Sequence, residues 1–168
     1  NPLDSHGTAQ NGELSAEQRI EMMIALLLPE STGSLRLASA DPSVQPRLDY
    51  NYLDSPFDRD RLRAGVRLAL GLAEHNDLKP LIGERVEPDG KDLASDEALD
   101  DWMMRSATTY SHISGTCKMG PSSDPMAVVD QLGKVRGSEN LRIIDESNMP
   151  DLVRPGINRT VLRPSLKH

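Results

Sequence analysis

One histidine lies in a stretch of small polar residues that suits a functional loop. Residues 110–120 read YSHISGTCKMG, so His112 has Ser, Gly and Thr as near neighbours. A histidine can take up and release a proton near neutral pH, and loops on a rigid scaffold often carry catalytic groups. From the residues alone, two interpretations stay open: a catalytic base, or an ordinary surface or helix-capping histidine.

A second segment joins an apolar run to an acidic end and a polar turn. Residues 140–150 read NLRIIDESNMP, and residues 153–158 read VRPGIN. Asp145 and Glu146 directly follow the apolar run, and Asn158 closes the second stretch. The residues again allow two interpretations. Either these polar groups belong to a site, or Asp145 caps the next turn and Asn158 is a loop amide.

Two helices are predicted to position these loops. Apolar residues recur at helical spacing in residues 59–75, and Asp58 precedes them as a candidate N-cap. A second helix is predicted from a cap at Ser95 to about Ala107. One face of this second helix carries three apolar residues: Leu99, Trp102 and Met103.

Short extended segments complete the pattern. The apolar block 19–28 fits either a buried strand or a helix, because it is too short for its periodicity to decide. Leu35 and Leu37 alternate with polar neighbours, which predicts a half-buried strand, and residues 47–56 predict a second one ended by Pro56. Three short apolar runs after residue 126 also predict β structure. Helices segregated from strands favour an α+β fold with helices on one face of an antiparallel sheet.

Composition excludes several classes of protein. The net charge of −7 disfavours nucleic-acid binding, because an acidic chain repels phosphate backbones. A single cysteine excludes an internal disulfide and a cysteine-based metal site, and no metal is expected. The longest apolar stretch, 22–28, is far short of the roughly 18 residues of a membrane span. We therefore expect a cytoplasmic protein with no membrane span.

The order of the motifs resembles the glucose–methanol–choline (GMC) family of flavin-dependent alcohol oxidoreductases. The resemblance runs through H-x-x-G-T-C-x-M-G at 112–120, A-V-V-D at 127–130 and V-x-G-x-x-N-L-R-I-I-D-x-S-x-M-P at 135–150. Upstream, PESTG at 29–33 and the strand and helix after it fit the family's substrate-binding domain. The resemblance covers about residues 26–162 and rests on several ordered motifs.

The resemblance implies that the parent enzyme transfers a hydride from an alcohol to FAD. His112 matches the family's catalytic base, which takes the hydroxyl proton near the flavin ring. The family usually places a second catalytic His or Asn in the loop that contains residues 156–158. That position falls near Gly156 in this chain, so either the loop is shifted and Asn158 serves, or the position is lost.

The resemblance also assigns residues to the cofactor. Asp145 and Glu146 match a pair whose backbone approaches the ribityl and diphosphate part of FAD. Gly156 and Ile157 match the loop at the pyrimidine edge of the flavin ring. The sequence contains no Gly-x-Gly-x-x-Gly run, so we expect the N-terminal Rossmann-type FAD-binding unit to be missing from this chain.

Three regions are therefore predicted. Residues 1–18 are a polar loop or linker, 19–110 are part of the substrate-binding domain, and 111–168 are a C-terminal, flavin-facing segment whose end looks truncated. The expected partners are a small-molecule alcohol and the missing FAD-binding portion, and the chain is expected to be inactive alone. Two alternatives stand beside this: a flavin-containing hydroxynitrile lyase, and a non-catalytic interaction fragment.

Overall fold

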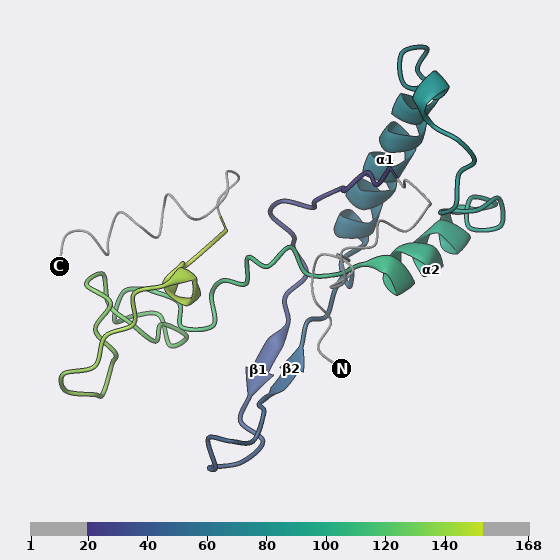
Figure 1. Cartoon of the computed structure of the whole chain (residues 1–168). Helices are drawn as coiled ribbons and strands as arrows, with labels where there is room; N and C mark the ends of the chain where they lie inside the picture. The colour runs from purple at the N-terminus through teal and green to yellow at the C-terminus, as the bar shows by residue number, and fades with distance from the viewer. Residues whose placement is uncertain (1–19, 153–168) are drawn as a thin grey trace, which may run out of the picture.

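The computed structural model describes residues 20–152, a part that contains two helices, two strands and two single 3-10 turns. The predicted linker 1–18 and the residues after 152 lie outside this part. In chain order (Figure 1) the elements are β1 (Ser34–Arg36), β2 (Arg47–Asp49), α1 (Pro56–Ala73), the 3-10 turn η1 (Lys79–Leu81), α2 (Asp96–Ser106) and the 3-10 turn η2 (Glu146–Asn148). Within residues 20–152, no helix is long and apolar enough to cross a membrane.

The two predicted N-terminal strands pair as an antiparallel hairpin. Leu35 of β1 stands opposite Leu48 of β2. The hairpin projects away from both helices (Figure 1), and every residue of both strands is exposed. Antiparallel pairing was predicted correctly. The predictions of a half-buried strand and of helices on one face of the sheet were wrong for the described residues. Alternation of apolar and polar residues indicates a strand but does not show that another layer covers it.

Helix α1 begins earlier than its periodicity indicated. Ser55 is the N-cap, and its side-chain oxygen accepts a hydrogen bond from the Phe57 amide at 3.2 Å. Pro56 occupies the first turn, where its missing N–H is no loss, so it starts the helix rather than only ending the preceding segment. Asp58 is not the cap: it is fully buried inside the first turn.

Helix α2 follows its prediction closely. Ser95 is the N-cap and accepts a hydrogen bond from the Ala98 amide at 3.1 Å, and Ala107 is the C-cap. The predicted apolar face is also confirmed. Leu99 and Met103 are 1% and 2% exposed, and Trp102 packs against the same cluster.

A small apolar core holds the helices together. Its buried members are Leu53, Val66, Leu99 and Met103. The block 20–28 forms neither a helix nor a strand, but its Ile24 and Leu26 pack against this cluster. The apolar block therefore serves as an irregular segment that covers part of the helix pair.

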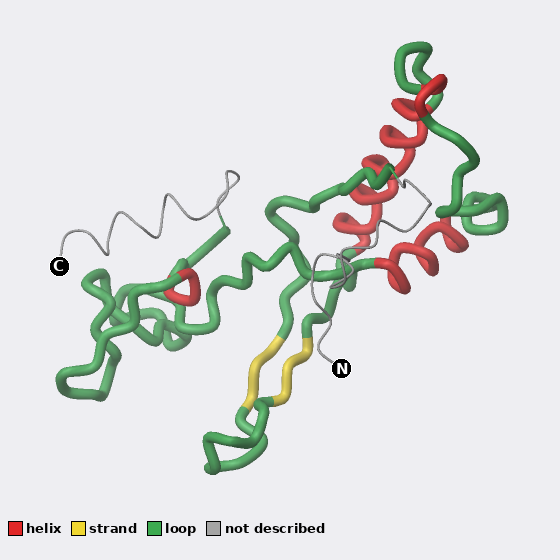
Figure 2. Tube along the Cα trace, in the orientation of Figure 1, coloured by secondary structure: helices red, strands yellow, loops and turns green. Residues whose placement is uncertain are grey.

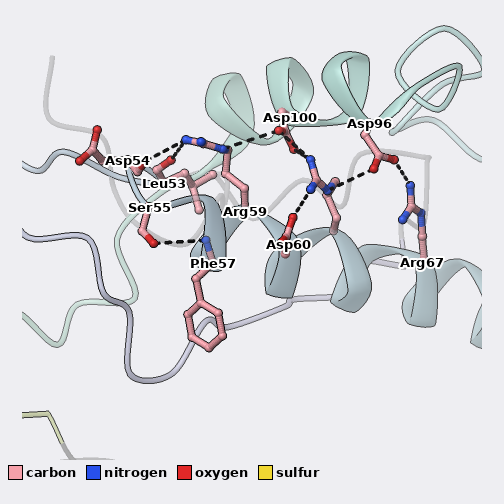
Figure 3. A network of polar contacts seen from close by, with 10 residues as sticks. Leu53, Asp54, Ser55, Phe57, Arg59, Asp60, Arg67, Asp96 and Asp100 are labelled. Atoms are coloured by element: carbon pink, nitrogen blue, oxygen red, sulfur yellow. Dashed lines mark hydrogen bonds and ion pairs between the residues drawn. The ribbon is translucent and has the colours of Figure 1, made fainter.

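Charged groups link the facing sides of α1 and α2 (Figure 3). Arg63 donates hydrogen bonds to both carboxylate oxygens of Asp100, at 2.9 and 2.8 Å, and also pairs with Asp60. Its Nε lies 3.8 Å from Asp96, which in turn pairs with Arg67. These contacts hold α2 against α1, and the chain continues from the end of α2 toward His112.

Residues 110–152 form a loop-rich region that lies apart from the two helices (Figure 2). The three predicted β runs do not make regular strands here. They are joined by isolated bridges between Met119 and Val129, between Val129 and Val135, and between Lys134 and Arg142. Val129, which takes part in two of these bridges, is completely buried and anchors the region.

Candidate functional site

Two loops that are distant in the sequence are held together by backbone hydrogen bonds. The amide of Cys117 donates to the carbonyl oxygen of Ser147 at 2.9 Å, and the amide of Met119 donates to that of Asn148 at 2.8 Å. The loop that follows His112 therefore lies against η2. The pairing gives the histidine loop a defined place.

The ring of His112 is flanked by an aromatic ring and a carboxylate. The Tyr110 ring meets it edge to face, with centroids 5.0 Å apart and planes at 71°. On the Nδ1 side, the distance from Nδ1 to Oε1 of Glu146 is 3.8 Å. Nδ1 is buried and has no hydrogen-bond partner among the described residues. Since the side chain as a whole is 28% exposed, its solvent-facing surface belongs to its other atoms.

Asp145 uses its carboxylate within its own turn. Its Oδ1 accepts a hydrogen bond from the Ser147 amide at 2.8 Å and another from the Ser147 hydroxyl. This is the capping role that the residues alone allowed, and Asp145 is the N-cap of η2. The expected approach of the Asp145 and Glu146 backbone to a cofactor stays a prediction. Gly156, Ile157 and Asn158 lie outside the described residues, so their roles also stay predictions.

A broad hollow of about 2480 Å³ runs beside these loops and along the helix pair. Its lining includes Trp102, Tyr110, His112 and Ser114. A pocket for a small molecule usually measures about 300–1,000 Å³, so this hollow is larger than a finished substrate site. It is an open surface and not an enclosed pocket.

Three residues that line the hollow each carry a buried polar atom with which a bound group such as a flavin ring could form a hydrogen bond. Trp102 Nε1, His112 Nδ1 and Ser114 Oγ are buried without hydrogen-bond partners among the described residues. Unpartnered buried polar atoms are uncommon in folded proteins and often mark a place that a ligand completes. The Gly-x-Gly-x-x-Gly run that often cradles a dinucleotide diphosphate at a helix start does not occur in the sequence. Residues 20–152 also hold no cluster of metal-binding side chains.

The contact between His112 and Glu146 was missed by sequence reasoning, which assigned Glu146 through its backbone. No local pattern reveals this contact, because it depends on the pairing of two separated loops. The sequence likewise assigned no role to Tyr110, which begins the segment that holds His112. An aromatic residue two positions before a candidate base was the available signal for it.

Comparison with known proteins identifies the same region as the sequence motifs. A family model described as GMC oxidoreductase matches residues 29–162. An oxygen-dependent choline dehydrogenase from Proteus mirabilis is 39% identical over 132 residues, which are 79% of this chain and 23% of that protein. One from Staphylococcus aureus is 37% identical over 143 residues, 84% of this chain and 25% of that protein.

Solved structures match over the same range. A pyridoxine 4-oxidase from Mesorbium loti superposes with a TM-score of 0.71 at 30% identity, over 84% of this chain and 27% of that one. A fungal aryl-alcohol oxidase gives a TM-score of 0.68 at 32% identity, over 84% and 23%. An FAD-dependent oxidoreductase from Chaetomium thermophilum gives 0.72 at 25% identity, over 84% and 24%. The chain thus spans about a quarter of the length of the proteins that it matches.

Proposed function

Because this chain belongs to the GMC oxidoreductase family, we propose that it supplies the substrate-facing, C-terminal part of an FAD-dependent alcohol oxidoreductase. The observation that carries the proposal is the placement of His112. Its loop is held against η2, its Nδ1 is buried, and the rest of its side chain is left accessible at the open hollow. A base at this position could accept a proton from an alcohol bound between this chain and the FAD-binding portion of the enzyme.

His112 acts as the general base in this proposal. FAD, when bound, would supply the acceptor for the hydride that leaves the alcohol carbon. His112 takes the hydroxyl proton, which allows the carbonyl double bond to form, and proton transfer of this kind is worth about 10²–10⁴-fold in rate. Asn158 is the proposed second group, where its amide would orient the alcohol oxygen.

The balance of buried and exposed side chains supports a second body of protein. Within the described residues, seven hydrophobic side chains are buried, whereas 22 large ones are exposed. Full burial of one large apolar side chain contributes about 1.5–3 kcal/mol. A second protein body that covered even some of these exposed side chains would therefore bind favourably. We propose that the FAD-binding portion of the enzyme covers it, and that the chain is inactive without that portion.

The first experiment tests cofactor binding. The chain is purified alone, mixed with FAD, freed of unbound cofactor and scanned between about 350 and 500 nm for bound flavin. We expect no stoichiometric flavin with the chain alone, and retained flavin when it is joined to a GMC-type FAD-binding portion. Tight, stoichiometric flavin on the chain alone would contradict the division of labour proposed above.

The second experiment tests the catalytic assignment in the joined protein. Turnover of a panel of alcohols, choline and aromatic alcohols included, is followed with a dye as electron acceptor. His112→Ala is expected to lower kcat by about 10²–10⁴-fold. The matched control is His75→Ala, because the side chain of His75 is 60% exposed at the far end of α1. Turnover that His112→Ala leaves unchanged would refute the assignment.

The same assay separates the two alternative functions. A hydroxynitrile lyase would cleave a cyanohydrin without dye reduction and would still depend on His112. A non-catalytic interaction fragment would support neither reaction in any joined form. Dye reduction that requires both the alcohol and His112 is the outcome that the proposed function predicts.

A further inference from the structure

We infer that the side chain of Glu146 is a positioning residue for His112, which holds the imidazole so that Nε2 is the nitrogen presented to the substrate. The inference deepens the proposed function, because it rests on His112 as the base. It assigns to Glu146 a side-chain role that is distinct from the backbone contact expected from the family resemblance.

The geometry places the carboxylate at the correct ring nitrogen. Oε1 of Glu146 lies 3.8 Å from Nδ1 of His112, which is an ion-pair distance and slightly too long for a hydrogen bond. A rotation of the Glu146 side chain that shortens this distance by about 1 Å would allow Nδ1–H to donate to the carboxylate. Nδ1 has no hydrogen-bond partner among residues 20–152, and the Glu146 carboxylate lies at ion-pair distance from it, so we assign Glu146 as its acceptor.

The backbone around Glu146 is fixed more firmly than its side chain. Ser147 and Asn148 accept the two hydrogen bonds from the His112 loop through their carbonyl oxygens. The side-chain amide of Asn148 donates to the carbonyl oxygen of Ile143 at 3.1 Å. The backbone of the turn that carries Glu146 is therefore held by hydrogen bonds. A change in the side-chain torsion angles of Glu146 is enough to bring its carboxylate closer to Nδ1.

A carboxylate at Nδ1 determines which nitrogen acts as the base. A neutral imidazole carries one proton, so a proton held on Nδ1 leaves the lone pair of Nε2 available. The negative charge also stabilises the imidazolium that forms when Nε2 takes up the substrate proton, as a carboxylate does in hydrolytic triads. Because both side chains are about one quarter exposed, at 28% and 27%, solvent moderates this charge effect, and the choice of tautomer is the larger consequence.

Tyr110 supports the same orientation from another side. Its ring packs edge to face on the imidazole, with the centroids 5.0 Å apart, and limits how far the ring can turn. A fixed ring plane lets a single acceptor select the tautomer. The two contacts together describe a histidine that is oriented before any substrate arrives.

The direct test measures the tautomer in the full chain by nitrogen NMR of ¹⁵N-labelled histidine. The chain contains four histidines, and His112→Gln identifies the signals of His112 by their loss. In the wild-type chain we expect neutral His112 to carry its proton mainly on Nδ1. Glu146→Ala should move the proton toward Nε2, whereas Glu146→Gln should keep it on Nδ1 because the amide oxygen still accepts a hydrogen bond.

Two further variants keep the test decisive. Glu146→Asp retains the charge and the polar turn but withdraws the carboxylate by one methylene, so it should also lose the Nδ1–H form. Glu139→Ala removes an exposed carboxylate of the same loop-rich region and should leave the signals of His112 unchanged. A proton that remains on Nδ1 in Glu146→Ala or in Glu146→Asp would overturn the inference.

Kinetics of the protein joined to its FAD-binding portion give an independent measurement. Glu146→Ala should lower kcat by about 10- to 100-fold, as the loss of a carboxylate behind a metal-bound histidine does, with KM changed by less than about twofold. Glu146→Gln should recover most of kcat. Equal kcat values in Glu146→Ala and the wild type would contradict the inference. If His112→Ala itself had no effect on turnover, the proposed function would fail while the tautomer result still stood.

Discussion

The carboxylate of Asp58 accepts a hydrogen bond from the Ser31 hydroxyl at 2.6 Å and another from the Ser31 amide at 2.7 Å. The Glu30 amide donates to the same carboxylate at 3.0 Å. Asp58 is fully buried, and its partners lie 27 and 28 residues earlier in the chain. One side chain thereby ties the segment before the hairpin to the first turn of α1.

Replacement of Asp58 by alanine should destabilise the helix pair by at least about 2 kcal/mol. The variant leaves two backbone N–H groups and one hydroxyl without their acceptor, and each unpaired buried donor costs about 1–3 kcal/mol. Urea unfolding followed by the fluorescence of Trp102, which packs against the core, measures the change. Asp60→Ala is a control for the general loss of an acidic residue on α1, since the side chain of Asp60 is 65% exposed. Equal losses in the two variants would contradict the role of Asp58.

Acid should weaken the same contact. Burial alone would raise the pKa of Asp58, but the hydrogen bonds from Ser31 and Glu30 and the nearby charge of Arg61 hold the pKa below its usual value. A pKa that is lower in the folded state than in the unfolded chain stabilises the fold fully above the unfolded value, about 4. That contribution is lost as the pH falls through the folded pKa.

The expected result is a free energy of unfolding that declines as the pH is lowered from about 5 to about 2. Asp58→Asn should flatten this decline, because the amide does not titrate in that range. Urea titrations at a series of pH values give the two curves. A slope in Asp58→Asn as steep as that of the wild type would show that other carboxylates dominate.

The two arginines that link α1 to α2 should differ in their effect on stability. Arg63 contacts Asp60, Asp96 and Asp100, and its side chain is 16% exposed. Among residues 20–152, Arg67 pairs only with Asp96, and its side chain is 57% exposed, which leaves it screened by solvent and salt. Arg63→Met should therefore lower the melting temperature more than Arg67→Met. The ranking is measured by thermal unfolding at low salt and again at high salt, where the effect of Arg67→Met should shrink first.

Leu99 should be one of the most sensitive apolar positions in the helix pair. It is 1% exposed within the core cluster, and truncation of a buried leucine to alanine costs about 2–5 kcal/mol. Met104→Ala on the same helix removes a side chain that is 54% exposed, so its effect should stay within about 0.5 kcal/mol. Chemical unfolding of both variants gives the comparison. A large loss in Met104→Ala would mean that its surface is covered in solution.

The sequence predicted best those features that depend on near neighbours. Helix α2 was placed correctly because its cap at Ser95 and its apolar face lie within one short stretch. Helix α1 was found, but its cap was assigned to Asp58 instead of Ser55. The partners that bury Asp58 are Glu30 and Ser31, and no local pattern shows that an acidic residue in a first turn will bind a distant backbone.

Local sequence patterns could not predict features that depend on residues far away in the chain. Alternation around Leu35 indicated a strand but not whether a layer covers it, and in the described residues the hairpin is exposed. The family resemblance assigned His112 and the 140–150 segment to one flavin site, and the structure adds that their loops are joined by backbone hydrogen bonds. The side-chain contact of His112 with Glu146 emerged only from that pairing.

Two glycines with a positive φ offer a matched test of how firmly the segment that leads to Glu146 is held. Gly133 and Gly137 both have a φ of +72°, which costs other residues about 1–2 kcal/mol. A Cβ at Gly133 would lie 2.6 Å from the carbonyl oxygen of Ile143, whereas a Cβ at Gly137 would meet nothing within 4 Å. Ala at Gly133 therefore adds a steric clash to the conformational cost, and overpacking of this kind costs about 1–3 kcal/mol.

The consequence of that clash should reach the loop of His112. The Ile143 amide donates to the Gly133 carbonyl oxygen at 2.9 Å, and the chain then continues into the turn that carries Glu146. Hydrogen exchange of the Ile143 and Met119 amides measures how firmly the two loops are held. Gly133→Ala should lower their protection by about tenfold more than Gly137→Ala does, since 1.4 kcal/mol corresponds to a factor of about ten. Equal protection in the two variants would contradict the prediction. It would mean that the backbone at Ile143 shifts to accept the added methyl group without loosening the two loops.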